Sequence, residues 1–173
     1  MATIKAPKLS EYIRQLELLE DHTDELCKMA VWSGAKVAAD AISEAIDDIT
    51  VHGLPAGSKY YYLSKKARAA GEMLDGVTAE QAKGLKDGLG IAVMAYKGNA
   101  WNTKVGFDGY NSVKTKTYPK GQPNALIARS VESGSTVRNK TPFIAPAVEK
   151  VKEKAIDAMT VTVEQQIAAL TKK

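Results

Sequence analysis

The residues that most often carry catalysis are few in this sequence, and their spacing matches no familiar catalytic motif. There are two histidines, His22 and His52, and one cysteine, Cys27. Hydrolytic and transfer enzymes need a nucleophile, a base and an orienting group in one place, and neither histidine stands in such a motif. We predict helix-end or surface positions for both. Because Leu26 and Met29 lie close to Cys27, we expect a small, buried, unreactive thiol.

Metal and nucleotide sites also have recognisable spacings, and none is present here. The sequence has no Cys/His cluster with zinc spacing and no acidic run that resembles a calcium loop. Residues 84–90 read Gly-Leu-Lys-Asp-Gly-Leu-Gly, but they lack the Gly-Lys-Ser/Thr ending of a phosphate loop and precede a predicted strand. Pairs such as Glu17 with Glu20, or Asp47 with Asp48, fall on polar helix faces. We therefore predict no enzyme, no cofactor and no metal site.

Charge is unevenly distributed along the chain, although the formal net charge is only +4. The segment from 97 to 140 has eight basic and two acidic residues, hence +6, which leaves −2 for the rest. The basic residues are Lys97, Lys104, Lys114, Lys116, Lys120, Arg129, Arg138 and Lys140, and the acids are Asp108 and Glu132. Such a surface fits phosphates or an acidic protein partner. A solvated loop kept soluble by lysines accounts for it equally well.

Apolar spacing predicts long N-terminal helices over 8–50. The stretches 9–19 and 37–49 both repeat apolar residues at helical intervals. Thr23 and Asp24 are good helix caps, so we expect a short break or kink at 22–24. Gly53 and Pro55 end the helical region. We predict an irregular insertion over residues 53–77. It contains three consecutive tyrosines at 60–62, followed by a short helix from 64 to 74.

The stretch 78–141 predicts a helix, a hairpin and loops. Thr78 with Gln81 three residues later matches a capping box, which starts a short helix. The β-favourable runs 91–96 and 101–107 predict a hairpin with one apolar face.

Residues 108–124 are polar and glycine-rich, which is typical of a long exposed loop. Asn124 is the expected cap of a helix over 125–132, and Gly134 is expected to end that helix before a second polar loop at 133–140.

A long helix is expected over 142–171, because Pro142 and Pro146 both suit a first helical turn and apolar residues recur behind them. The whole pattern predicts a single α+β domain, residues 1–173. Its small antiparallel sheet packs against long N-terminal helices and a long C-terminal helix. No apolar run is long enough to span a membrane, and residues 1–8 lack the apolar stretch of a secretory signal. We therefore expect a chain made and kept in a cytoplasm.

Residues 128–147 read A-R-S-V-E-S-G-S-T-V-R-N-K-T-P-F-I-A-P-A. This stretch resembles the signature of the tail-completion, or head–tail joining, family of long-tailed (siphovirus) bacteriophages, similar to the lambda minor tail protein Z group. The family pattern is a short helix, Glu-x-Gly-Ser/Thr, a polar loop, and Pro-Phe-Leu/Ile-x-Pro-Ala opening the last helix. The matching residues are Glu132, Gly134, Ser135, Pro142, Phe143, Ile144, Pro146 and Ala147.

The resemblance covers residues 80–160 and extends to the N-terminal helices only by pattern. Residues 53–75 are longer than the family pattern, and Ser133 stands where many members carry an aromatic residue.

The resemblance implies a structural virion protein that works in the neck or tail-top ring. It implies a homo-oligomeric ring, six subunits being the expected number, whose cyclic symmetry creates an axial channel for DNA. The implied partners are neighbouring neck and tail proteins, namely the head stopper, tail terminator and tail tube, with non-specific contact to genomic DNA and no membrane partner. The chain would be made in the bacterial host cytoplasm and end in the virion.

The motif and the loops beside it also have expected physical roles. Gly134 is expected to stop a helix in a left-handed conformation, and Phe143 to pin the next helix to the hairpin. Glu132 opposes the dipole of its own helix, so we expect a cationic partner, either Arg129 or a neighbouring subunit. Loops 108–123 and 133–141 are expected to contact other subunits or neck partners and to order on assembly. The residues expected to face DNA or a partner are Lys114, Lys116, Lys120, Arg138 and Lys140.

The alternative interpretation is a small basic nucleic-acid-binding protein that uses segment 97–140 directly. It would need aromatic side chains for base stacking among the charges. Tyr110 and Tyr118 are present, without a repeating platform.

Overall fold

The computed structural model describes residues 9–52 and 65–171, so the Tyr60–Tyr62 run and residues 1–8 lie outside the described residues. The elements in chain order are α1 (Leu9–Asp47), β1 (Val51–His52), α2 (Lys65–Ala69), β2 (Val77–Thr78), α3 (Ala79–Gly88), β3 (Leu89–Ile91), β4 (Ala95–Lys97), β5 (Ala100–Asn102), β6 (Val105–Phe107), α4 (Asn124–Ser133) and α5 (Ile144–Thr171). Long first and last helices with small antiparallel strand pairs confirm the predicted α+β class.

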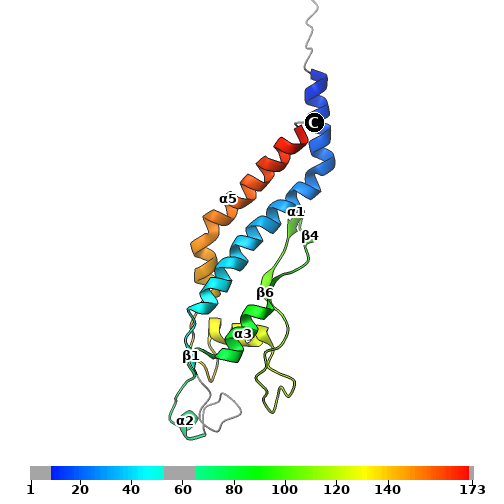
Figure 1. Ribbon diagram of the computed structural model, residues 1–173. Helices are drawn as coiled ribbons and strands as arrows, with labels where there is room; N and C mark the ends of the chain where they lie inside the picture. Colours follow the sequence, from blue (N-terminus) through cyan, green and yellow to red (C-terminus); the bar gives the residue numbers. More distant parts are fainter. Residues whose placement is uncertain (1–8, 53–64, 172–173) are drawn as a thin grey trace, which may run out of the picture.

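Two long helices lying side by side give the molecule its elongated shape (Figure 1). α1 and α5 run antiparallel and share the most extensive contact between any two elements of the described chain. The hairpin of β3 to β6 lies along α1 on the side away from α5, while α3, α4 and the loops gather at the C-terminal end of α1 (Figure 1). The first half of α1 and the end of α5 therefore project beyond the rest of the fold.

α1 is unbroken from Leu9 to Asp47, so the predicted break at 22–24 is wrong. His22 Nδ1 lies 2.8 Å from the carbonyl oxygen of Leu18, and Thr23 Oγ1 donates to the carbonyl oxygen of Leu19 at 2.7 Å. Side chains that can cap a helix are able to bond the carbonyl one turn back instead, which leaves the helix intact. The two apolar stretches therefore belong to one helix.

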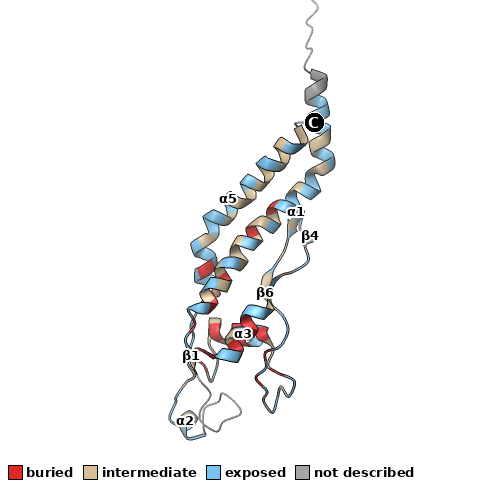
Figure 2. Ribbon diagram, in the orientation of Figure 1, coloured by how far each residue is buried: buried red, intermediate tan, exposed pale blue. Residues whose placement is uncertain are grey.

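The hydrophobic core is concentrated at the C-terminal end of α1. Ile42, Ile46 and Ile49 pack there against α3, α4 and the first turn of α5. Their buried apolar partners are Val77, Leu85, Ile127, Ala128, Val131, Phe143 and Ala147. In Figure 2 the buried segments cluster in this part of the molecule, whereas most of α5 is half-buried or exposed. Most of the fully buried apolar side chains therefore lie at this end of the molecule.

Small side chains let α1 and α5 approach closely at Gly34. A Cβ atom built on Gly34 would lie 2.8 Å from both Cγ and Sδ of Met159 and 3.4 Å from the carbonyl oxygen of Ala155. Next to it, Ser33 Oγ donates to the carbonyl oxygens of Ala30 at 2.8 Å and of Ala158 at 3.2 Å. The backbones of the two helices therefore meet directly at this point.

Replacing Gly34 with leucine is expected to lower the free energy of unfolding by about 3 kcal/mol, because the added atoms must push the helices apart. Gly34→Ala is the graded control. Its single methyl group contacts the flexible side chain of Met159, which can move aside. Alanine is more favourable than glycine in a helix by about 1 kcal/mol, so the net change in the free energy of unfolding should be small. Urea denaturation followed by circular dichroism measures both variants. Equal stabilities for the two would show that the helices do not touch here.

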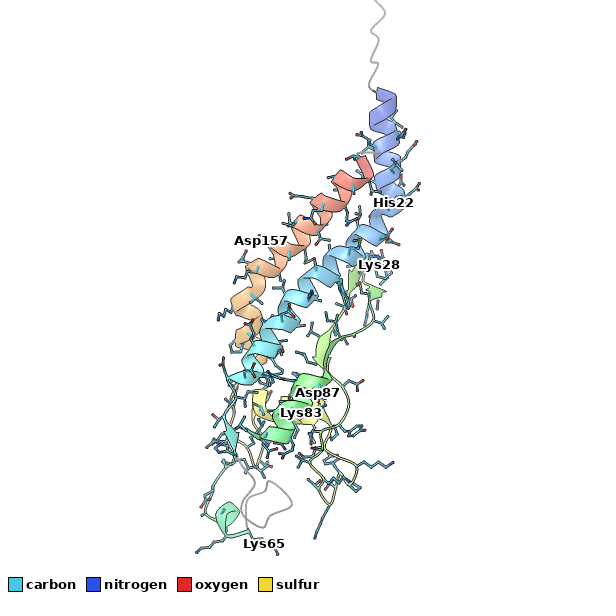
Figure 3. All side chains as sticks on the ribbon, in the orientation of Figure 1. His22, Lys28, Lys65, Lys83, Asp87 and Asp157 are labelled. Carbon is cyan, nitrogen blue, oxygen red and sulfur yellow. The ribbon has the colours of Figure 1, made fainter. Side chains whose placement is uncertain are left out.

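The predicted hairpin is confirmed, with an interruption along its length. β3 pairs with β6 and β4 pairs with β5, both antiparallel, and residues 92–94 and 103–104 separate the two pairs. The turn uses Gly98 and Asn99 with φ of 63° and 59°, values that suit a tight hairpin connection. The tip docks on α1, where Trp101 Nε1 donates to Asp24 Oδ1 at 2.9 Å and Lys28 Nζ lies 4.1 Å from the ring centroid. Figure 3 shows Lys28 pointing toward this tip.

The insertion after α1 differs from the prediction in two ways. The helix expected over 64–74 is limited to Lys65–Ala69, and Gly71 follows with φ of 76°, a conformation that ends it. A short parallel pair, β1 with β2, was not predicted and joins the end of α1 to the start of α3. The capping box at Thr78 is confirmed, since Gln81 N donates to Thr78 Oγ1 at 3.2 Å and Thr78 N donates to Gln81 Oε1 at 3.1 Å.

Candidate assembly site

The residues of the sequence motif meet at the junction between α4 and α5, and Glu132 is the centre of that junction. Its Oε2 accepts hydrogen bonds from the backbone N–H groups of Phe143 and Ile144, both at 2.8 Å, and its Oε1 accepts one from Ala145 at 3.0 Å. Ile144 and Ala145 open α5 and Phe143 directly precedes it, and N–H groups at this position have no partner within the helix. One carboxylate from α4 therefore caps the N-terminus of α5.

Arg129, the cation expected beside Glu132 within the chain, does not act on it, and Lys140 does. Burial raises the pKa of Glu132, but hydrogen bonds from the N–H groups of Ile144, Ala145 and Phe143, together with the positive charge of Lys140, outweigh it and hold the pKa below its ordinary value. The charged form is stabilised mainly by a helix N-terminus, where the macrodipole also favours negative charge. Sequence reasoning considered only the helix that Glu132 belongs to, and not the helix that it faces.

The other motif residues shape the chain between the two helices. Gly134 ends α4 with φ of 74° and ψ of 174°. Only glycine adopts this combination of positive φ and extended ψ readily. The predicted left-handed helical conformation has a similar φ but a much smaller ψ. Ser135 N donates to the Arg138 carbonyl oxygen at 2.9 Å and closes a tight turn. Phe143 is 5% exposed and its ring lies 6.0 Å from that of Phe107, which confirms that it pins α5 to the hairpin.

Pro142 and Pro146 lie in a groove between the end of α1 and the start of α5. The volume of the groove is about 370 Å³. Glu44 and Asp48 line it from α1, while Lys150 and Lys154 line it from α5. Its remaining residues are Ala41, Ala45, Ile49, Thr141, Phe143, Ala147 and Val151. The groove therefore combines apolar side chains with charged side chains of both signs. Pro142 was predicted to open α5, but it lies two residues before the first helical residue, Ile144.

The loop 108–123 is fastened to α3 at two glycines, a feature that sequence reasoning missed. Gly84 and Gly88 lie one turn apart on α3, and a Cβ on either would overlap the loop, at 2.5 Å from Asn111 Cβ and 2.2 Å from the Asp108 carbonyl oxygen respectively. Asn124 Nδ2 donates to that same oxygen at 2.8 Å. The Gly-x-x-x-Gly spacing within a predicted helix was the available signal, because such a pair presents a smooth face for close packing.

Further hydrogen bonds define the base of this loop. Gln81 Nε2 donates to Gln122 Oε1 at 2.6 Å, and Asn111 N donates to the Gln122 carbonyl oxygen at 2.9 Å. Asn111 and Val113 are buried. The expectation that this loop is wholly exposed and orders only on assembly is therefore wrong for these residues. The expectation that Asn124 caps α4 is also wrong, since Pro123 is the N-cap residue and makes no side-chain cap bond.

The cations expected to face DNA or a partner divide into two groups. Lys114, Lys116, Lys120 and Lys140 are exposed, the first three on loop 108–123. Arg138 is only 5% exposed, so it is not a surface cation of the chain. It lies in the turn that pairs with Leu74 and ties loop 133–141 to the segment before β2. The polar loop is thus held in place, and its arginine has a structural position.

Across 9–52 and 65–171, no group of three or more His, Cys, Asp and Glu side chains is placed to hold a metal ion. Cys27 is exposed on α1, so its predicted burial is wrong. No helix in the same ranges is both long enough and apolar enough to cross a bilayer.

Apolar side chains remain at the surface of both long helices. Within α5 only Ala147 is buried, out of 28 residues. The large apolar side chains exposed on the two helices are Ile13, Leu16, Met29, Trp32, Val148, Ile156 and Val161. A long helix pair that buries so few of its side chains has apolar surface available for other molecules.

Comparison of the chain with protein-family models, with curated proteins and with solved structures finds no match.

Proposed function

We propose that the chain is a structural subunit of a tailed bacteriophage that completes the tail or joins it to the head. The sequence motif at 128–147 suggests this family, and the geometry gives the motif a coherent physical role. Its glutamate, glycine and phenylalanine act together to fix the angle between α4 and α5. A subunit of a ring needs such fixed angles, because each copy must present the same surfaces to its neighbours.

The observation that carries the proposal is the incomplete burial of the α1–α5 pair. Within α5 only Ala147 is buried, and the other described residues are half-buried or exposed, so the helix leaves part of its apolar area in contact with solvent. Trp32 is 48% exposed and Ile156 is 49% exposed, so apolar area remains on each of the two helices. Burial of such surfaces between copies, or against a neighbouring neck protein, would supply the missing stabilisation.

Deletion of the gene from the phage or prophage that encodes it tests this proposal. We expect DNA-filled heads and free tails that fail to join, seen by negative-stain electron microscopy, together with loss of infectivity. Supplying the wild-type chain in trans should restore joined particles, and supplying Gly34→Leu, which disturbs the helix pair, should restore fewer. Normal particles in the absence of the chain would overturn the proposal.

A second candidate is a small nucleic-acid-binding protein, favoured by the exposed Lys114, Lys116 and Lys120 on one loop. The aromatic residues available are Tyr110, which is exposed, and Tyr118, which is half-buried. Fluorescence anisotropy with generic duplex DNA at physiological salt distinguishes the two candidates. Micromolar or tighter binding by a monomer would favour this second function.

A further inference from the structure

The first half of α1 carries carboxylates that have no ion-pair partner within the described chain. The five acids between positions 17 and 25 are Glu17, Glu20, Asp21, Asp24 and Glu25, and no lysine or arginine lies among them. All five are exposed. The salt bridges among the described residues join Lys83 to Asp87 and Lys86 to Asp47. Figure 3 shows Lys83 and Asp87 far from His22, which lies within this stretch. We call residues 13–29 of α1 the acidic end; five carboxylates against Arg14 and Lys28 give it a formal charge of −3.

The acidic end also has apolar character. Ile13 and Leu16 are 48% and 66% exposed, one turn before the carboxylates. A cleft of about 190 Å³ lies at the same end and is lined by His22, Glu25, Leu26, Met29, Gln166 and Leu170. A surface with carboxylates around exposed aliphatic groups matches a partner that offers cations together with an aromatic or aliphatic side chain.

Loop 108–123 has that complementary composition. It carries the exposed cations Lys114, Lys116 and Lys120, and Tyr110, which pairs with Pro123 at the base of the same loop, is 68% exposed. Its base is fastened to α3, so its tip is presented on a defined support. Figure 1 shows the loop at the opposite end of the molecule from the start of α1. The loop therefore does not reach the acidic end of its own chain.

We propose that the acidic end of one copy binds loop 108–123 of the next copy. The two surfaces differ from one another, so the contact is of the head-to-tail kind, which closes into a ring when the rotation between copies is right. This inference rests on the proposed function, which supplies the ring. It adds the two surfaces through which neighbouring copies would contact each other. Attraction between opposite charges across an interface sets register and weakens with salt.

Charge reversal on each side, followed by recombination, tests the contact. The loop variant is Lys114→Glu with Lys116→Glu and Lys120→Glu, and the helix variant is Glu17→Lys with Glu20→Lys and Asp21→Lys. Asp24 is left unchanged because it bonds Trp101. Sedimentation velocity of the full chain should show self-association about tenfold weaker or more for either variant alone. An equimolar mixture of the two variants should associate, since each supplies a surface that fits the other.

Lys65→Glu with Lys66→Glu and Lys104→Glu is the matched control, because it makes the same charge change on exposed residues outside the groove, the acidic end and loop 108–123. It should associate like the wild type. Circular dichroism checks that every variant is folded. This inference is overturned if the wild-type chain stays monomeric or if the mixture of variants fails to associate. The phenotype of the gene deletion decides separately whether the chain has the proposed neck function. Loss of duplex DNA binding in the loop variant, with association unchanged, would also overturn it and would favour the nucleic-acid-binding candidate.

Discussion

Replacing Glu132 with glutamine is expected to lower the free energy of unfolding by about 2 kcal/mol at neutral pH, because three backbone N–H groups of α5 lose a charged acceptor. Glutamine keeps the shape of the side chain but has a single acceptor oxygen, and its NH₂ group faces donors. Urea denaturation of the purified chain measures the loss. Glu153→Gln, on an exposed part of α5, is the matched control and should change little.

The effect of Glu132 should depend on pH in a definite direction. Its pKa in the folded chain is lowered, although burial alone would raise it, because hydrogen bonds from Ile144, Ala145 and Phe143 prevail. A lowered folded pKa means that the stabilisation is complete above the unfolded pKa, about 4.3 for glutamate. It is lost as pH falls through the folded value. The difference between wild type and Glu132→Gln should therefore shrink in acid, and a difference that stays constant down to pH well below 4 would contradict the cap.

Replacing Gly88 with alanine should destabilise the chain by about 3 kcal/mol, because the added methyl group overlaps the backbone of loop 108–123. Its Cβ would lie 2.2 Å from the Asp108 carbonyl oxygen and 2.5 Å from Asn124 Nδ2. The carbonyl oxygen belongs to the main chain at the end of the hairpin and cannot rotate away. The loop should be displaced from α3, and its loosened backbone should be cleaved faster by trypsin at its lysines, which are already exposed.

Gly90→Ala is the control for this substitution, since a Cβ on Gly90 has no heavy atom within 4 Å. Gly88 is the last residue of α3 and Gly90 lies two residues later in β3, so the two sites are close in the chain but differ in the space available for a methyl group. Thermal denaturation and the rate of tryptic cleavage at Lys114 and Lys116 report on stability and loop attachment. If Gly88→Ala matched Gly90→Ala in both measurements, the loop would not be seated on α3 as described.

Local sequence signals predicted the elements that depend on residues close in the chain. Thr78 and Gln81 form the capping box because both partners lie within one turn. The hairpin follows from two β-favourable runs around Gly98 and Asn99, whose positive φ values suit the turn. The long C-terminal helix was also predictable from apolar spacing and from proline near its start.

Features that depend on distant residues were not predictable in the same way. Thr23 looks like a helix cap in sequence, but within α1 it bonds the carbonyl oxygen of Leu19 and the helix continues. Arg129 was expected as the partner of Glu132 within the chain, whereas this carboxylate faces the N-terminus of a helix that starts twelve residues later. Arg138 was expected at the surface because of its charge, and the fold buries it. In each case the deciding partner is set by tertiary packing, which spacing along the chain does not reveal.

The close crossing of α1 and α5 also affects how the chain is made. Ser33 and Ala158, which are hydrogen-bonded across it, are 125 residues apart, so almost the whole chain must be synthesised before the two helices can meet. Contacts between such distant residues form slowly because closing a long loop costs entropy. Until then the apolar residues of α1 have no partner from α5 and are open to chaperones or to aggregation with other nascent chains. Translation speed and co-expressed chaperones therefore bear on the yield of folded subunits.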